Sequence, residues 1–269
     1  MFKKVFRKIS GQKISYFEKM LLSTKKDYFM SDLIFKDSKG IALDFGLNVG
    51  AFAFNNVNKF HKIFAVEASS DCLKDAKKNL KKIPLEKIEF IHAALSNKSN
   101  EQVSLKKVIV NGEFESKDFS ILDLNNSDLE KTDYIGRFGE QIEVVNSLSW
   151  PDLMNKIGKP QVRLLKCDIE GAEYQLFINC DLSNVEYLIF ELHYTFLGKE
   201  KVSELLNHLT KYFNFYFNKD KCLLESNSWP PPSILYMVNK NIDLKIPLWL
   251  KLLRTPFFKV RFFIIDFFS

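Results

Sequence analysis

The sequence has few cysteines, and their spacing does not indicate a metal site or a redox motif. Among 269 residues there are four cysteines, and no two of them form a C-x-x-C pair. They are Cys72, Cys167, Cys180 and Cys222. This spacing argues against a zinc centre, so we expect reduced and mostly packed thiols in a reducing compartment.

Long apolar runs are missing as well. The chain contains no stretch of about 18 uncharged apolar residues, the length that a transmembrane helix requires. The segment MFKKVFRKIS carries positive charge, but no apolar region follows it as in a secretory signal peptide. We therefore expect neither a transmembrane helix nor a signal peptide, and a cytoplasmic location.

The chain also lacks the basic clusters that bind nucleic acids. Its formal net charge is +6, but the lysines are scattered and no lysine-rich block is interleaved with aromatic residues. We therefore expect no nucleic-acid partner. The mild excess of positive charge favours an anionic partner, such as a nucleotide cofactor, a phosphorylated sugar or an anionic membrane surface.

A regular alternation of strands and helices begins at residue 41. Short apolar runs predict strands at 41–45, 62–69, 87–96, 141–148, 162–169 and 185–194, with helical patterns between most of them. This order predicts a doubly wound, mostly parallel sheet with right-handed crossovers. Two later runs, NFYFN and SILYMVN, predict a closing antiparallel pair.

The composition divides the chain into three parts. Residues 1–38 are basic and aromatic, and we expect a leader segment packed on the core. Residues 39–240 form the main domain, with an insertion or lid at about 96–140 where the alternation stops. Residues 241–269 are apolar with interspersed lysines and arginines, which indicates either a packed terminal helix or an amphipathic segment on a membrane surface.

The segment LDFGLNVG carries a cofactor signal at the carboxyl end of the first predicted strand. It places Asp44, Gly46, Asn48 and Gly50 where a parallel sheet binds its ligand. Gly46 allows a tight turn, and Gly50 allows the following helix to pack near the sheet. The spacing is G-x-x-x-G, with Asn48 in place of the middle glycine that a dinucleotide requires. Asp44 suits a cationic amino-acid group better than a phosphate.

An acidic residue at the end of the second predicted strand strengthens this signal. Glu67 lies 67 − 46 = 21 positions after Gly46, close to the spacing at which an acid binds ribose hydroxyls. S-adenosylmethionine offers a charged amino-acid end and a ribose, and it has no phosphate. The sequence therefore favours this cofactor over NAD.

Carboxylates gather where the fourth parallel strand ends, in RLLKCDIEGAEYQLF. Asp168, Glu170 and His193 are candidates for positioning an acceptor hydroxyl or taking its proton. Glu191 is expected to orient His193 or to bind the acceptor. Glu173 is a second candidate for substrate contact, or an acid that only begins a helix.

The same residues include hard ligands for a divalent cation. Asp168, Glu170, Glu191 and His193 offer oxygen and imidazole ligands to magnesium or manganese. Nothing in their spacing requires such an ion, so we expect no metal.

Five motifs together resemble the FkbM family of S-adenosylmethionine-dependent methyltransferases. They are LDFGLNVG, FAVEAS, HAALSN, LLKCDIEGAEYQLF and IFELHY, and the resemblance runs from about residue 41 to 195. It implies a class I methyltransferase fold, with a Rossmann-like, seven-stranded, mostly parallel and doubly wound sheet in an α/β/α arrangement. The family mostly methylates hydroxyl oxygens, often on sugars or natural products.

The resemblance also implies which residues bind the cofactor. The glycine segment lines the methionine end, Glu67 holds the ribose, and His92, Ala93 and Ala94 lie beside the adenine. The expected cofactor-binding residues are Asp44, Gly46, Asn48, Gly50, Glu67, Ala68, His92 and Ala93. Leu47 departs from the small residue that the family commonly carries there.

The sequence thus predicts an O-methyltransferase that acts on a sugar or glycoconjugate precursor. Two alternatives remain, an NAD-dependent oxidoreductase and a non-catalytic fold that serves as a membrane-surface adaptor. The adaptor alternative depends on residues 241–269, which are candidates for peripheral contact with the inner face of the membrane. The sequence indicates neither the acceptor nor the oligomeric state.

Overall fold

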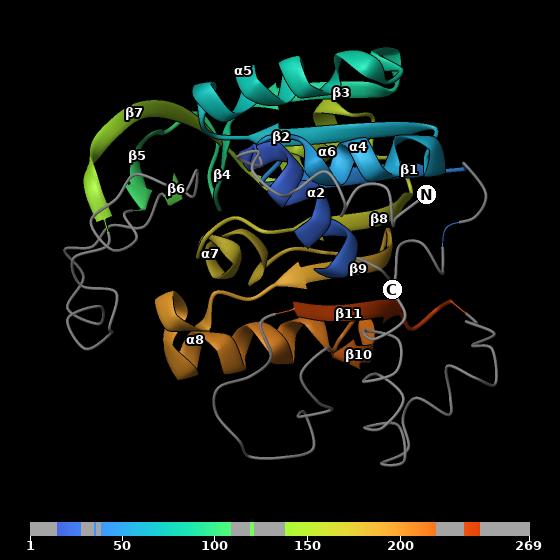
Figure 1. Ribbon diagram of the computed structural model, residues 1–269. Coiled ribbons are helices and arrows are strands. Elements are labelled where there is room, and N and C mark those ends of the chain that lie inside the picture. The colour runs from blue at the N-terminus through green and yellow to red at the C-terminus, as the bar shows by residue number, and fades with distance from the viewer. Residues whose placement is uncertain are drawn as a thin grey trace, which may run out of the picture.

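A computed structural model describes residues 15–27, 35, 39–108, 119–120, 138–218 and 234–242 (Figure 1). Cys222, most of the basic aromatic segment 241–269 and parts of the leader and of the insertion lie outside these ranges. The predictions made for those parts stay predictions.

The main sheet has seven strands in the order β10-β11-β9-β8-β1-β2-β3. The strands are β1 (Ile41–Phe45), β2 (Lys62–Glu67), β3 (Ile88–His92), β8 (Val162–Cys167), β9 (Val185–Glu191), β10 (Phe213–Asn218) and β11 (Ile234–Asn239). β11 is antiparallel to both neighbours, and the other paired strands are parallel. The predicted doubly wound, mostly parallel sheet and its closing antiparallel pair are confirmed.

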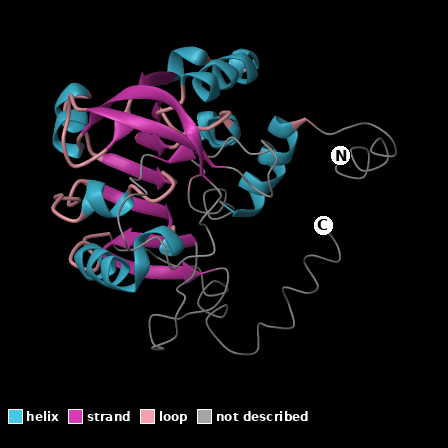
Figure 2. Ribbon diagram, turned by 90° about the vertical axis from the view of Figure 1, so that its left-hand side faces the viewer, coloured by secondary structure: helices cyan, strands magenta, loops and turns pink. Residues whose placement is uncertain are grey.

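Helices cover both faces of this sheet and make three layers (Figure 2). One face carries α4 (Ala51–Asn56) and α5 (Ser70–Asn79), and the other carries α6 (Trp150–Lys156), α7 (Glu173–Phe177) and α8 (Tyr194–Leu209). Short 3-10 turns at Val57–Lys59, Leu80–Lys82 and Leu85–Lys87 connect the elements of the first face. Each face buries its own apolar cluster, because alternate strand residues point to opposite sides.

Large aromatic side chains fix the end of β8 that carries the candidate site. Phe45, Phe177 and Phe190 are fully buried and lie between the sheet and its second helical face. The Phe45 and Phe177 rings are stacked with centroids 6.4 Å apart. The indole of Trp150 joins this cluster and donates a hydrogen bond to the Asp181 carbonyl at 3.0 Å.

Helix α2 (Tyr16–Asp27) packs against α4. Ser15 and Glu18 form a capping box at its start, in which each side chain bonds the other residue's backbone N–H. The Phe17 ring meets the Phe54 ring edge-on, with centroids 5.6 Å apart. This contact joins the described part of the leader to the first helical face.

A second sheet follows β3, in the order β4-β7-β5-β6. Its strands are β4 (Ala94–Leu95), β5 (Gln102–Val108), β6 (Phe119–Ser120) and β7 (Phe138–Leu148). The prediction of one strand over 87–96 was wrong, because the chain leaves the main sheet at Ala93. The partner strand β2 ends at Glu67, opposite His92, so residues beyond Ala93 pair with β7 instead.

None of the described helices combines the length and the apolar character needed to cross a bilayer.

Candidate functional site

A cleft opens where β1, β2 and β8 end, at their carboxyl edge. It encloses about 580 Å³ including open solvent at its mouth. Its lining residues are Gly46, Asn48, Val66, Glu67, Ala68, Ala93, Ala94, Leu95, Leu105, Asp168, Ile169, Glu170 and Ala172. Of the predicted site residues, seven therefore line one cavity, together with Ala94 beside them.

Gly46 brings the ends of β1 and β8 into direct contact. Its φ is +73°, and a Cβ added there would lie 1.8 Å from the Asp168 carbonyl oxygen. The Asp168 N–H in turn donates to the Phe45 carbonyl at 3.1 Å. Glycine is required because another backbone segment occupies the space of a side chain, a reason that the sequence did not reveal. Gly50 lies outside the lining, and its open side faces the Leu80 side chain.

Glu67 is held by two backbone amides at the cleft wall. The Asn48 N–H donates to its Oε2 at 2.7 Å, and the Ser69 N–H donates to its Oε1 at 2.8 Å. Burial raises the pKa of Glu67, while these two bonds oppose the shift. Asn48 adopts φ +51°, a left-handed conformation that asparagine tolerates. The two hydrogen bonds thus fix the carboxylate in one orientation.

Asp44 lies beneath the cleft and is absent from its lining. Its side chain is fully buried, and its Oδ1 lies 3.5 Å from the Lys166 ammonium. Burial raises the pKa of Asp44 to about 6, and Lys166 opposes this rise. The sequence predicted that Asp44 lines the methionine end of the cofactor, whereas the cation that it faces in this structure belongs to the protein.

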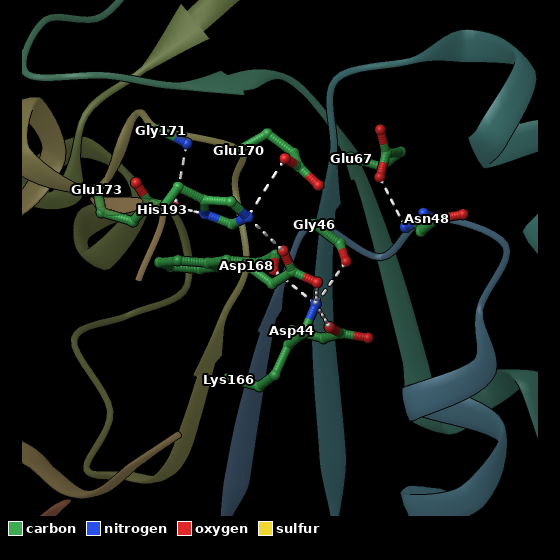
Figure 3. A network of polar contacts seen from close by, with 11 residues as sticks. Asp44, Gly46, Asn48, Glu67, Lys166, Asp168, Glu170, Gly171, Glu173 and His193 are labelled. Carbon is green, nitrogen blue, oxygen red and sulfur yellow. Dashed lines mark hydrogen bonds and ion pairs between the residues drawn. The ribbon is translucent and has the colours of Figure 1, made fainter. Parts of the chain in front are cut away.

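Sequence reasoning missed Lys166, the most connected cation of the site (Figure 3). Its Nζ donates to the carbonyls of Phe45 at 3.0 Å and Gly46 at 2.7 Å, and lies 3.4 Å from Asp168 Oδ2. Its side chain is only 4% exposed. The available signal was a lysine inside the apolar run VRLLKC, two residues before Asp168.

Carboxylates keep the Lys166 side chain charged despite its burial. Burial alone would lower the pKa of Lys166, but the carboxylates of Asp168, Asp44 and Glu191 outweigh it and raise the pKa above its usual range. Glu191 lies half-buried at the carboxyl end of β9. The ammonium therefore neutralises negative charge contributed from three strand ends.

A second cation, His193, lies among carboxylates at the rim of the cleft (Figure 3). Its Nε2 is 3.2 Å from Glu170 Oε2 and 3.8 Å from Asp168 Oδ1. Its Nδ1 is 2.6 Å from Oε1 of Glu173, which is fully buried and also accepts the Gly171 N–H at 3.1 Å. The structure thus brings together the three predicted catalytic residues.

Glu173 lies outside the cleft lining, and the substrate contact that was one of its two expected roles stays a prediction. It begins α7, as the helix-start alternative supposed, and it also holds the His193 ring. The sequence assigned the orienting role to Glu191, but the carboxylate in contact with Nδ1 is that of Glu173. Burial would lower the pKa of His193, but Glu170, Glu173 and Asp168 outweigh it and raise the pKa well above 6.5. The surrounding carboxylates therefore favour the protonated form of His193.

The same cluster has the donor set of a divalent metal site. Asp168, Glu170 and His193 each offer one ligand atom, and these atoms lie within 4.8 Å of one another. Two carboxylates and one imidazole suit magnesium or manganese. Because the pKa of His193 is raised, a proton competes with any metal ion for Nε2.

The opposite end of the cleft is apolar. Ala93, Ala94 and Leu95 line it from the chain after β3, and Leu105 reaches it from β5. His92, predicted beside them, lies outside the lining, with Nε2 2.9 Å from the Ala68 carbonyl and 3.3 Å from Glu143 Oε1. Leu105 was missed because it belongs to the polar, turn-rich insertion.

Residues 44–219 match the family model of the methyltransferase FkbM domain. No curated protein is similar enough in sequence to match the chain.

Several solved structures are similar to the chain at low sequence identity. The chain is similar to a methyltransferase FkbM from Methylobacillus flagellatus KT at 11% identity and a TM-score of 0.46, covering 86% of this chain and 57% of that one. It is also similar to M. capricolum TrmK in complex with S-adenosylhomocysteine (13%, TM-score 0.38, covering 89% and 75%). A third is Aeropyrum pernix fibrillarin with bound S-adenosylmethionine (9%, TM-score 0.40, covering 79% and 73%).

Proposed function

The chain belongs to the FkbM methyltransferase family, and from this premise we propose that it methylates a hydroxyl oxygen on a sugar or glycoconjugate precursor. The cofactor is S-adenosylmethionine, which supplies an electrophilic methyl group on its sulfonium when bound. The family assignment favours methyl transfer over the hydride transfer of an NAD-dependent oxidoreductase.

The cleft offers groups that fit each part of this cofactor. Glu67 presents a fixed carboxylate for the ribose hydroxyls, and the apolar wall suits the adenine. Gly46 and Asn48 line the part of the cleft assigned to the methionine end. The Asn48 Oδ1 is buried and has no hydrogen-bond partner among the described residues, so it is available to a ligand donor.

Oxygen methylation is supported above all by the contact between His193 and the carboxylates at the rim of the cleft. A hydroxyl oxygen becomes nucleophilic when a nearby group takes its proton. Asp168 and Glu170 line the cleft and are the proton acceptors that we propose. His193 contacts both as an imidazolium, so it holds them in place and balances their charge.

Isotope labelling tests this function directly. Cells with and without the gene are supplied with methionine carrying a labelled methyl group, and their glycans are analysed by mass spectrometry. We expect glycans from cells with the gene to carry one labelled methyl group on a sugar oxygen. This group should be absent from cells without the gene. Complementation with Asp168→Asn, whose side chain keeps nearly the same volume, should not restore it. A labelled methyl found only on nitrogen or carbon would refute the proposed O-methylation.

A further inference from the structure

A buried lysine joins the turn at the cofactor end of the cleft to the carboxylate beside it. Lys166 lies in β8 next to Leu165 and Cys167, both fully buried. Burying an ammonium group is unfavourable unless it is paired and hydrogen-bonded. The contacts of Lys166 with the Phe45 and Gly46 carbonyls and with Asp44 and Asp168 therefore explain how the chain tolerates it there.

Lys166 and β2 hold Gly46 from opposite sides. The Gly46 N–H donates to the Val66 carbonyl at 3.0 Å, and its carbonyl accepts from Lys166 at 2.7 Å. The Leu47 N–H donates to the same Val66 carbonyl at 3.1 Å. Both backbone groups of Gly46 are thus occupied, and the ammonium is the partner of its carbonyl.

We propose that Lys166 is a positioning residue for the methionine end of S-adenosylmethionine, because it holds the Gly46 carbonyl and links the Gly46 turn to Asp44. This inference rests on the proposed function. Asp44 does not line the cleft, so its effect on the cofactor passes through the ammonium 3.5 Å away.

The carboxylates around Lys166, including its partner Asp44, come from four strands of the main sheet. Asp44 lies on β1, Glu67 on β2, Asp168 after β8 and Glu191 on β9. Lys166 is the cation that opposes the raised pKa of Asp44. When the ammonium is removed, we expect Asp44 to take up a proton near neutral pH and the turn to lose its fixed carbonyls.

Two ligands that differ only in the amino-acid end distinguish positioning from general support. S-adenosylhomocysteine carries the methionine-like end, and 5′-methylthioadenosine lacks it. We expect Lys166→Met to weaken S-adenosylhomocysteine at least about tenfold in titration calorimetry, the value of one charge-assisted hydrogen bond. The affinity for 5′-methylthioadenosine should stay unchanged. Lys62→Met, at the opposite end of β2, is the matched control and should change neither affinity.

Each alternative result has a distinct meaning. Equal weakening of both ligands would overturn the inference and leave Lys166 as a purely structural residue. Unchanged affinity for both would overturn it as well. Failure of the unaltered protein to bind S-adenosylhomocysteine would instead refute the proposed function.

Two further variants keep the inference testable if Lys166→Met does not fold. Lys166→Arg keeps the charge but replaces a compact ammonium by a planar fork, and it should weaken S-adenosylhomocysteine selectively. Asp44→Asn should do the same, and adding Lys166→Arg to it should have less effect than Lys166→Arg alone. Fully additive effects would show that Asp44 does not act through Lys166.

Discussion

The contact between Glu173 and His193 gives the sharpest prediction, because one substitution tests both the charge of His193 and its role. Glu173→Gln keeps the shape of the side chain and an oxygen that accepts from Nδ1. It removes the negative charge that lies 2.6 Å from the ring. The protein then loses a charge-assisted hydrogen bond in a fully buried position.

The loss in stability should depend on pH. Hydrogen bonds to charged groups contribute about 1.5–3 kcal/mol, and we expect a decrease of this size in the free energy of unfolding. The folded-state pKa of His193 is raised above 6.5, so its contribution is complete below pH 6.5 and is lost as pH rises through the folded pKa. The difference between the two proteins should therefore be largest in mild acid and decrease towards alkaline pH.

Urea unfolding at a series of pH values measures this difference. His193→Gln serves as the control, and adding Glu173→Gln to it should have much less effect on the pH dependence. A stability difference that stays constant across the whole pH range would refute the argument that buried carboxylates keep His193 charged.

The pH dependence of methyl transfer tests the role of the ring. If His193 acts as an imidazolium that holds Asp168 and Glu170, the rate should fall as pH rises through its folded pKa. If neutral His193 takes the proton from the acceptor, the rate should rise through the same pKa. The second result would move the role of proton acceptor from the carboxylates to His193.

Three other predictions concern the cleft. Gly46→Ala should lower the free energy of unfolding by on the order of 2–4 kcal/mol, because the alanine would be strained at this positive φ and its Cβ would clash with Asp168. Gly50→Ala should lower it less, because its Cβ would meet only the flexible Leu80 side chain. Comparable losses in urea unfolding would contradict this. Glu67→Gln should lower the affinity for both S-adenosylhomocysteine and 5′-methylthioadenosine at least about tenfold in calorimetry, since both ligands contain the ribose. A loss of affinity for only one of them would show that Glu67 does not bind the ribose. Chelation with EDTA should leave methyl transfer unchanged; a loss of activity that magnesium restores would instead identify the three candidate ligands as a metal site.

The parallel sheet was predictable because its signals are local. Apolar runs of strand length alternate with helical patterns, and this alternation alone predicts a doubly wound sheet. The break after β3 was not predictable in the same way. The run 87–96 (KIEFIHAALS) contains no glycine or proline that would mark a break, and where it leaves the sheet depends on where its partner β2 ends.

For the site, the sequence predicted which residues come together better than it predicted which partner each side chain faces. Asp168, Glu170 and His193 meet because parallel strands end at one edge, which follows from the order of elements alone. The direction of Asp44 depends on Lys166, which comes from a strand about 120 residues later in the chain. A single lysine in a buried strand therefore indicated that an acidic side chain from a neighbouring strand would face it.

The second sheet has a consequence for how this cleft is built. Its strands pair with one another rather than with the main sheet, yet its Leu105 forms part of the cleft wall. From β7, Glu143 accepts hydrogen bonds from both the backbone N–H and the hydroxyl of Ser70 at 3.0 Å, which ties this wall to the rest. The apolar wall and the charged floor of the cleft thus belong to two different sheets. We expect substitutions in β5 to change the shape of the ligand space while the hydrogen bonds between β1 and β8 beneath Asp168 stay intact.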